Sequence, residues 1–144
     1  MPTADILVEE IGSGLWRLAG QSHHSVLVEF GDHTELIEVP LNETRTLAVI
    51  ARARALRPDK PLTRAIVTHH HFDHSAGIRA AIAEGLTLVT HEGNREFFED
   101  LAARTHSIVP DALARAPQPV MIETVGDEAV VRDATQAMHL YHVR

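Results

Sequence analysis

The sequence predicts one domain of the α/β class, in which strands and helices share a single core. Three observations support this prediction. The length of 144 residues fits one domain that is large enough to bury a core. Short runs rich in β-branched residues alternate along the chain with segments that carry apolar residues at helical spacing. Hydrophobic residues make up 44% of the chain and aromatic residues 4%, so the core is expected to be mainly aliphatic.

The first part of the chain has the pattern of antiparallel strands. The runs G-L-W-R-L-A-G, H-H-S-V-L-V-E-F and T-E-L-I-E-V are separated by Gly-Gln-Ser and Gly-Asp-His, which are turn sequences. We therefore expect a β-meander over residues 14–39, with Trp16 in the core.

A helix is expected next, from Asn42 through the segment N-E-T-R-T-L-A-V-I-A-R-A-R-A-L. Leu47, Ile50 and Ala51 stand at positions i, i+3 and i+4, which would place them on one inward face. The following R-P-D-K-P would end the helix, because proline interrupts helical hydrogen bonding.

The segment R-A-I-V-T, residues 64–68, is expected to form a buried strand that runs directly into a group of histidines. After this group, Ser75 is expected to cap a helix that turns Ile78 and Ile82 inward. Gly85 would end that helix.

The remaining segments continue the mixture of strands and helices. L-T-L-V-T (86–90) predicts a strand, and H-E-G-N-R-E-F-F-E-D-L-A-A-R-T predicts a helix with one of Phe97 and Phe98 in the core. His91, at the carboxyl end of this strand, could be a functional group at that edge of the sheet, although capping of the helix explains it as well. Three prolines then indicate an irregular connection. Three further strands are expected in M-I-E-T-V, E-A-V-V-R-D and T-Q-A-M-H-L-Y-H-V.

Charge and composition exclude several classes of partner. Asp and Glu number 20 against 13 Lys and Arg, and the resulting charge of -7 repels phosphate backbones, so we expect no nucleic-acid partner. No run of about 18 uncharged apolar residues occurs, and the first residues do not resemble a signal peptide. The chain as given is therefore expected to be soluble and cytoplasmic, with no membrane partner, while the compartment of a full-length form stays open.

The segment T-H-H-H-F-D-H, residues 68–74, holds four of the 11 histidines of a chain that contains no cysteine. Side chains alternate between faces in an extended segment, so His69 and His71 are expected on one side and His70 on the other. Two imidazoles on one side can hold one metal ion. Asp73 and His74, at the start of the next helix, would turn toward the same concavity. Without cysteine, any metal must use imidazole, carboxylate and water ligands.

Neighbouring histidines are more commonly solvated loop residues or an expression artefact. Here the group lies between an apolar strand and the helix entry S-A-G, which favours a metal site. Zinc accepts such nitrogen and oxygen ligands at about 2.0–2.2 Å and lowers the pKa of a bound water to about 7. The expected product is a hydroxide nucleophile at neutral pH.

In this context, the spacing H-x-H-x-D-H over residues 69–74 resembles the signature of the metallo-β-lactamase-fold hydrolases. The resemblance implies an αββα sandwich with a mixed, mostly antiparallel sheet flanked by helices. It implies that His69 and His71 bind a first metal ion, and that Asp73 and His74 bind a second. Asp73 would also act in catalysis by orienting the water. The cofactor would be one or two divalent ions, zinc first, with iron or manganese as alternatives.

The same resemblance implies a small-molecule substrate, in which a metal-bound hydroxide attacks an ester, lactone, amide, thioester or phosphoester. Three further residues are candidates for the surroundings of the site. Glu38 stands where the family commonly has an aspartate that supports the metal ligands, although a surface carboxylate is the alternative. His23 lies in a turn that would rim the cleft, unless it is a surface turn. His142 would lie on the approach to a loop that carries a third histidine ligand in the family.

The resemblance covers nearly all of residues 1–144 but only about the first half of the family's domain. Its third histidine, bridging aspartate and final histidine find no counterpart here. We therefore expect a fragment, or a truncated gene product, of a metal-dependent hydrolase with weak zinc binding and little turnover of its own. Half of such a sandwich exposes an apolar sheet face, which predicts a homo-oligomer that covers it. The alternative is a catalytically incomplete protein that binds metal and associates with itself.

Overall fold

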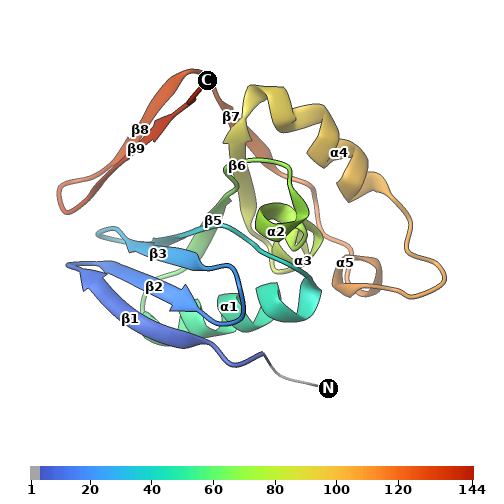
Figure 1. Ribbon diagram of the computed structural model, residues 1–144, viewed down its shortest axis with the longest axis horizontal. Coiled ribbons are helices and arrows are strands. Elements are labelled where there is room, and N and C mark those ends of the chain that lie inside the picture. Colours follow the sequence, from blue (N-terminus) through green and yellow to red (C-terminus); the bar gives the residue numbers. More distant parts are fainter. Residues whose placement is uncertain (1–3) are drawn as a thin grey trace.

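The computed structural model describes residues 4–144 and contains a seven-stranded sheet and a separate two-stranded hairpin (Figure 1). The sheet begins with four antiparallel strands: β1 (Leu7–Gly12), β2 (Leu15–Ala19), β3 (Ser25–Glu29) and β4 (Thr34–Ile37). The predicted meander over residues 14–39 is confirmed. The prediction missed β1, because this edge strand leaves 69% of Leu7 and 53% of Ile11 exposed and therefore carries no clear pattern of burial.

The second half of the sheet is parallel. From β4 the order continues through β5 (Leu62–Ile66), β6 (Thr87–His91) and β7 (Ile122–Val125). Helices make the crossovers that parallel pairing requires. They are α1 (Glu43–Leu56), α2 (Phe72–Ser75), α3 (Ile78–Ala83), the 3-10 turn η1 (Glu92–Asn94), α4 (Arg95–Ala103) and α5 (Ala112–Arg115). The carboxyl ends of β4 to β7 consequently lie at one edge of the sheet.

The hairpin consists of β8 (Glu128–Arg132) and β9 (Ala137–Tyr141), which pair antiparallel. Its turn is tied to the main sheet, because the backbone N–H of Gly31 donates to Asp133 at 2.6 Å. This hydrogen bond, with others from Thr135, holds the pKa of Asp133 below its usual range. The two strands carry half-buried residues in alternation with exposed ones, so one face of the hairpin is turned toward the sheet.

The predicted fold class is confirmed. Strands and helices share one mixed sheet, and antiparallel pairs outnumber parallel ones when the hairpin is included, four pairs against three. The predicted strands after residue 120 correspond to β7, β8 and β9. The core is aliphatic apart from Trp16, Phe30 and Phe98, all of which are buried, while Phe97 is 44% exposed. No helix within residues 4–144 is long and apolar enough to cross a membrane.

Helix α1 begins as predicted, with the side chain of Asn42 accepting a hydrogen bond from the backbone N–H of Arg45 at 2.8 Å. Its inward face differs from the prediction, because Ala51 is exposed. Two polar side chains occupy part of that face, which a search for apolar residues does not find. Thr46 donates to the carbonyl oxygen of Pro40 at 3.2 Å. The buried residues of the helix are Arg45, Thr46, Val49, Ile50 and Ala53.

The predicted role of Ser75 is wrong. The helical segment starts at Phe72, and Ser75 closes α2 instead of capping α3. The buried hydroxyl of Ser75 is shared between the carbonyl oxygens of His70 and His71, each at 2.9 Å. This hydrogen bonding folds the histidine segment back onto the first turn of α2.

Helix α3 follows the prediction. Ile78 and Ile82 are fully buried, and Gly85 ends the segment with a φ of +81°, a conformation that favours glycine. The predicted helix after β6 is present as η1 and α4. The side chain of His91 accepts from the backbone N–H of Gly93, which is the capping alternative of the two that the sequence left open.

A buried ion pair connects helix α3 to the segment that precedes α5. Arg79 on α3 donates to both carboxylate oxygens of Asp111, and its Nη1 donates to the carbonyl oxygen of Ala102 at 2.7 Å. The guanidinium of Arg79 is the main cause that lowers the pKa of Asp111 to about 2. The pair joins α3 to the segment between α4 and α5.

The Asp111→Asn variant is expected to lose a contribution to stability that depends on pH. A carboxyl group with a pKa of about 2 when folded and about 3.9 when unfolded stabilises the protein above pH 4. That contribution disappears as the pH falls through about 2. The urea midpoint of the variant should therefore lie below wild type at pH 7, and the gap should narrow by pH 2.5. Asp100→Asn is the control, because Asp100 forms an exposed ion pair with Arg104. Its urea midpoint should equal that of wild type at both pH values. A gap of equal size at both pH values for Asp111→Asn would contradict the assignment.

Candidate metal centre

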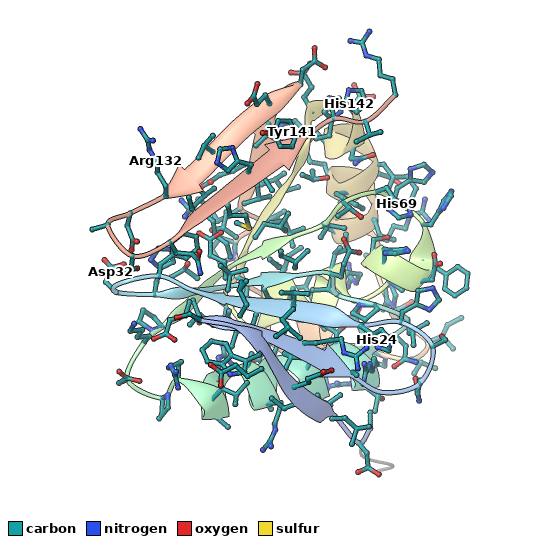
Figure 2. The ribbon with its side chains drawn as sticks, turned by 60° about the vertical axis from the view of Figure 1, so that its left-hand side comes forward. His24, Asp32, His69, Arg132, Tyr141 and His142 are labelled. Atoms are coloured by element: carbon teal, nitrogen blue, oxygen red, sulfur yellow. The ribbon has the colours of Figure 1, made fainter. Side chains whose placement is uncertain are left out.

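The histidine segment lies at the carboxyl edge of the parallel strands, between the end of β5 and the start of α2. Figure 2 shows His69 at this edge, at the same end of the molecule as His24 and His142. The backbone N–H of Thr68 donates to the carboxylate of Glu38 at 2.9 Å. The hydroxyl of Thr68 lies 2.9 Å from Nδ1 of His69. The entry to the segment is thus held by side chains from two neighbouring strand ends.

The rings of the four histidines of the segment lie against one another. The ring centroid of His69 lies 4.2 Å from that of His74 and 4.9 Å from that of His71. The His70 ring packs 5.3 Å from Phe97 on α4. The His71 ring lies 4.9 Å from both His69 and His70, so the rings of His74, His69, His71 and His70 form one series of contacts, with His70 at its α4 end.

Glu38 joins this group from the end of β4. Its side chain is buried, and its backbone has a φ of +70°, which is uncommon for a residue with a side chain. One carboxylate oxygen accepts from Thr68, and the other lies 2.9 Å from Nδ1 of His74. With its proton on Nδ1, His74 has a free lone pair on Nε2. Glu38 is therefore in contact with the histidine segment and is not a surface carboxylate.

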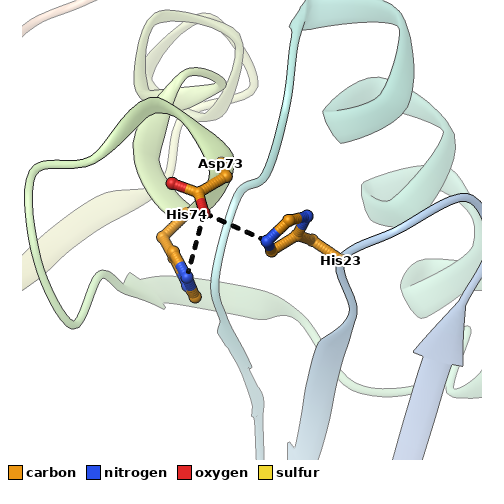
Figure 3. Close-up of side chains that lie close together, drawn as sticks. All are labelled: His23, Asp73 and His74. Carbon is orange, nitrogen blue, oxygen red and sulfur yellow. Dashed lines mark ion pairs between the residues drawn. The ribbon is translucent and has the colours of Figure 1, made fainter.

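Asp73, His74 and His23 bring ligand atoms within 4.8 Å of one another (Figure 3). The Oδ2 atom of Asp73 is 3.0 Å from Nε2 of His23 and 3.6 Å from Nε2 of His74. His69 and His71 lie beside this trio without belonging to it. The sequence left open whether His23 rims the cleft or lies in a surface turn. No sequence motif links His23 to Asp73, because the two residues are far apart in the chain: His23 lies in the loop between β2 and β3, and Asp73 lies on α2.

The pKa of His69 is lowered, first by partial burial and then by the neighbouring charge of His74. Both causes favour the neutral imidazole. A neutral ring is the form that binds metal ions, so His69 is suited to the predicted role.

A second group of possible ligands lies nearby and consists of His91, Asp127 and His142. The rings of His91 and His142 stack at 4.0 Å, and Nδ1 of His142 is 3.2 Å from Asp127. However, Nδ1 of His91 accepts a hydrogen bond from the backbone N–H of Gly93. The neutral ring then carries its proton on Nε2 and has no free lone pair for a metal ion.

A cavity of about 680 Å³ lies between the main sheet and the hairpin and reaches this edge. Its walls are mostly aliphatic, and its polar rim includes Thr68, His69, His91 and His142. Figure 2 shows the hairpin end with Tyr141 and His142 above the sheet edge that carries His69. The apolar side chains come from both layers: Ile37, Ile66, Val67, Val89, Val125, Met138, Leu140 and Val143.

Solved structures share this architecture. A metallo-β-lactamase from Pontibacter korlensis superposes with a TM-score of 0.67 over 95% of this chain, at 19% sequence identity. One from Hirschia baltica superposes with a TM-score of 0.60 over 86% of this chain, at 22% identity. The chain has the metallo-β-lactamase fold. The enzyme FIM-1 from Pseudomonas aeruginosa, in its mono-zinc form, matches this fold with a TM-score of 0.62 over 85% of the chain, at 17% identity.

The chain spans 60% of the Pontibacter structure, 56% of the Hirschia structure and 52% of the FIM-1 structure. The recognition of this fold from residues 69–74 is therefore confirmed, and so is the expectation that the match covers only part of a metallo-β-lactamase. No protein-family model and no curated protein sequence matches the chain.

Proposed function

We propose that this chain carries the metal-binding half of a metal-dependent hydrolase. The observation that supports this most directly is the convergence of His69, His71, Asp73 and His74 at the carboxyl edge of the parallel strands, in a metallo-β-lactamase fold. His69 and His71 would hold one divalent ion, and Asp73 and His74 would hold a second. Imidazole and carboxylate ligands suit zinc best, with iron or manganese as alternatives.

A zinc ion held at this site would acidify a water molecule and so supply a nucleophile near neutral pH. The residues of the chain would position the reaction. Asp73 would accept a hydrogen bond from that water and so orient its lone pair toward the substrate. Glu38 keeps the proton of His74 on Nδ1 and so keeps Nε2 available.

The cavity beside His69 would receive the substrate. Its aliphatic walls favour a small molecule with an apolar group next to the bond that is broken, and they exclude water from that side. The reaction class is hydrolysis of an ester, lactone, amide, thioester or phosphoester. The polar rim at Thr68 and His69 is the part of the cavity that would face the scissile bond.

A second candidate function is a metal-binding protein that associates with itself and has little turnover alone. The feature that supports it is the groove between sheet and hairpin, whose aliphatic side chains line an open cavity. Tyr141 and Val143 extend this apolar surface, since they are 62% and 86% exposed. We propose a second copy of the chain as the occupant, because matching aliphatic surfaces on two copies would cover each other.

Purified chain, loaded with zinc and dialysed, tests both candidates. We expect up to two zinc ions per chain by elemental analysis, with His71→Ala losing the weaker one. We expect little hydrolysis of esters, lactones, β-lactams and phosphodiesters, and a homodimer by light scattering. A folded chain that retains no zinc would contradict the hydrolase proposal. A clean monomer at micromolar concentration, or hydrolysis at ordinary enzyme rates, would contradict the second candidate.

A further inference from the structure

We propose that His23 is a metal ligand, which completes a three-residue site with Asp73 and His74. The inference rests on the proposed function and identifies the tighter of its two ion positions. The first ion position has two protein ligands, His69 and His71. The second has three, His23, Asp73 and His74. Three protein ligands and a water are the usual set for a catalytic zinc ion.

The tautomers of both histidines suit this role. Nδ1 of His23 lies 2.8 Å from the hydroxyl of Ser22, and Nδ1 of His74 lies 2.9 Å from Glu38. The proton of His74 lies on Nδ1, because Glu38 only accepts, and its Nε2 has a free lone pair. Without an ion, Nε2–H of His23 donates to Asp73 at 3.0 Å; an ion at this position would take the place of that proton, which then moves to Nδ1, where the Ser22 hydroxyl can accept it. A hydrogen-bond acceptor behind a ligating imidazole is the usual arrangement at metal sites.

The distances also suit a metal ion. Asp73 Oδ2 stands 3.0 Å from Nε2 of His23 and 3.6 Å from Nε2 of His74. Ligands of a tetrahedral zinc ion, at about 2.0–2.1 Å from it, lie about 3.3 Å apart. Figure 3 shows the two rings approaching the same carboxylate oxygen from opposite elements, the loop after β2 and helix α2. The donor set of two imidazoles and one carboxylate is among those that zinc prefers.

The loop that carries His23 is held in place from inside the domain. Arg45, a buried residue on α1, donates from Nη2 to the carbonyl oxygen of His23 at 3.0 Å. Its guanidinium passes so close to Gly20 that a Cβ there would lie 2.6 Å from Nη1, and Gly20 has a φ of +146°. Only glycine is suited to this position. Because its backbone is anchored, His23 pays little conformational entropy when it binds an ion.

The test compares His23→Ala with His24→Ala, which removes an exposed histidine from the adjacent position. Zinc affinity is measured by competition with a coloured chelator, and the visible spectrum of bound Co²⁺ reports the ligand set. We expect His23→Ala to weaken the tighter site by more than about 100-fold, beyond the 10–100-fold typical of residues that only support a ligand, and to change the Co²⁺ spectrum. His24→Ala and His71→Ala should leave the tighter site unchanged. Circular dichroism checks that each variant is folded.

The outcomes separate the two proposals. If His23→Ala binds zinc and Co²⁺ like wild type while His74→Ala does not, His23 only pairs with Asp73, and this inference is wrong while the hydrolase proposal stands. If wild-type chain binds neither metal, both proposals fail together. Loss of binding in His24→Ala to the same degree as in His23→Ala would also overturn the inference, because the effect would then belong to the loop and not to one ligand.

Discussion

Replacing Asp73 with asparagine is expected to weaken zinc binding by more than about 100-fold, judged against the 10–100-fold typical of residues that only support a ligand. The Oδ2 atom of Asp73 is the one ligand atom close to both His23 and His74. Asparagine has nearly the same shape, but its neutral amide removes the negative charge that the ion needs. Competition with a coloured chelator at pH 7 measures the loss.

Asp127→Asn is the matched control for this change. Asp127 belongs to the other group of possible ligands, with His91 and His142, and makes the same kind of contact with a histidine. We expect zinc binding by this variant to equal that of wild type, because the lone pair of His91 is already used by the backbone of Gly93. If Asp127→Asn loses zinc and Asp73→Asn retains it, the ion binds at the group of His91, Asp127 and His142, and our proposal is wrong.

Replacing Gly77 with alanine is expected to lower the free energy of unfolding by at least about 3 kcal/mol. Gly77 lies between α2 and α3, where α3 passes α1, and its N–H donates to the carbonyl oxygen of Val39 at 2.9 Å. A Cβ at this position would overlap Oγ1 of Thr46 and lie 2.5 Å from its Cβ. Rotation of the Thr46 side chain cannot relieve the second contact, because that atom is fixed to the backbone of α1. Denaturant unfolding measures the cost.

Gly126→Ala is the control, since no atom lies within 4 Å of a Cβ placed there. Its stability should stay within about 0.5 kcal/mol of wild type. Thr46→Gly should restore part of the stability of the Gly77→Ala variant, because it removes the overlapping atoms. Equal denaturant midpoints for Gly77→Ala and wild type would show that α1 and α3 can separate freely, contrary to this packing.

Local patterns predicted most of the elements correctly. The apolar run before the histidines became β5, and Ile78 and Ile82 became buried positions of α3, because each pattern depends only on residues close in sequence. The predictions failed for features that depend on contacts between residues far apart in the sequence. Ala51 is exposed because the inward face of α1 runs along Thr46, Val49, Ile50 and Ala53. Strand β1 forms by pairing with β2, although Leu7 and Ile11 stay exposed.

The sequence by itself determined that a dense group of histidine and aspartate side chains follows a buried strand, and its H-x-H-x-D-H spacing carried the resemblance to the metallo-β-lactamase fold, because both are properties of neighbouring residues. Only the tertiary structure decided which side chains share an oxygen of Asp73 and which carboxylate orients His74. These contacts join the loop after β2 and the end of β4 to helix α2. They depend on how the sheet is ordered and on the buried Arg45 that anchors the loop, and no local spacing encodes either.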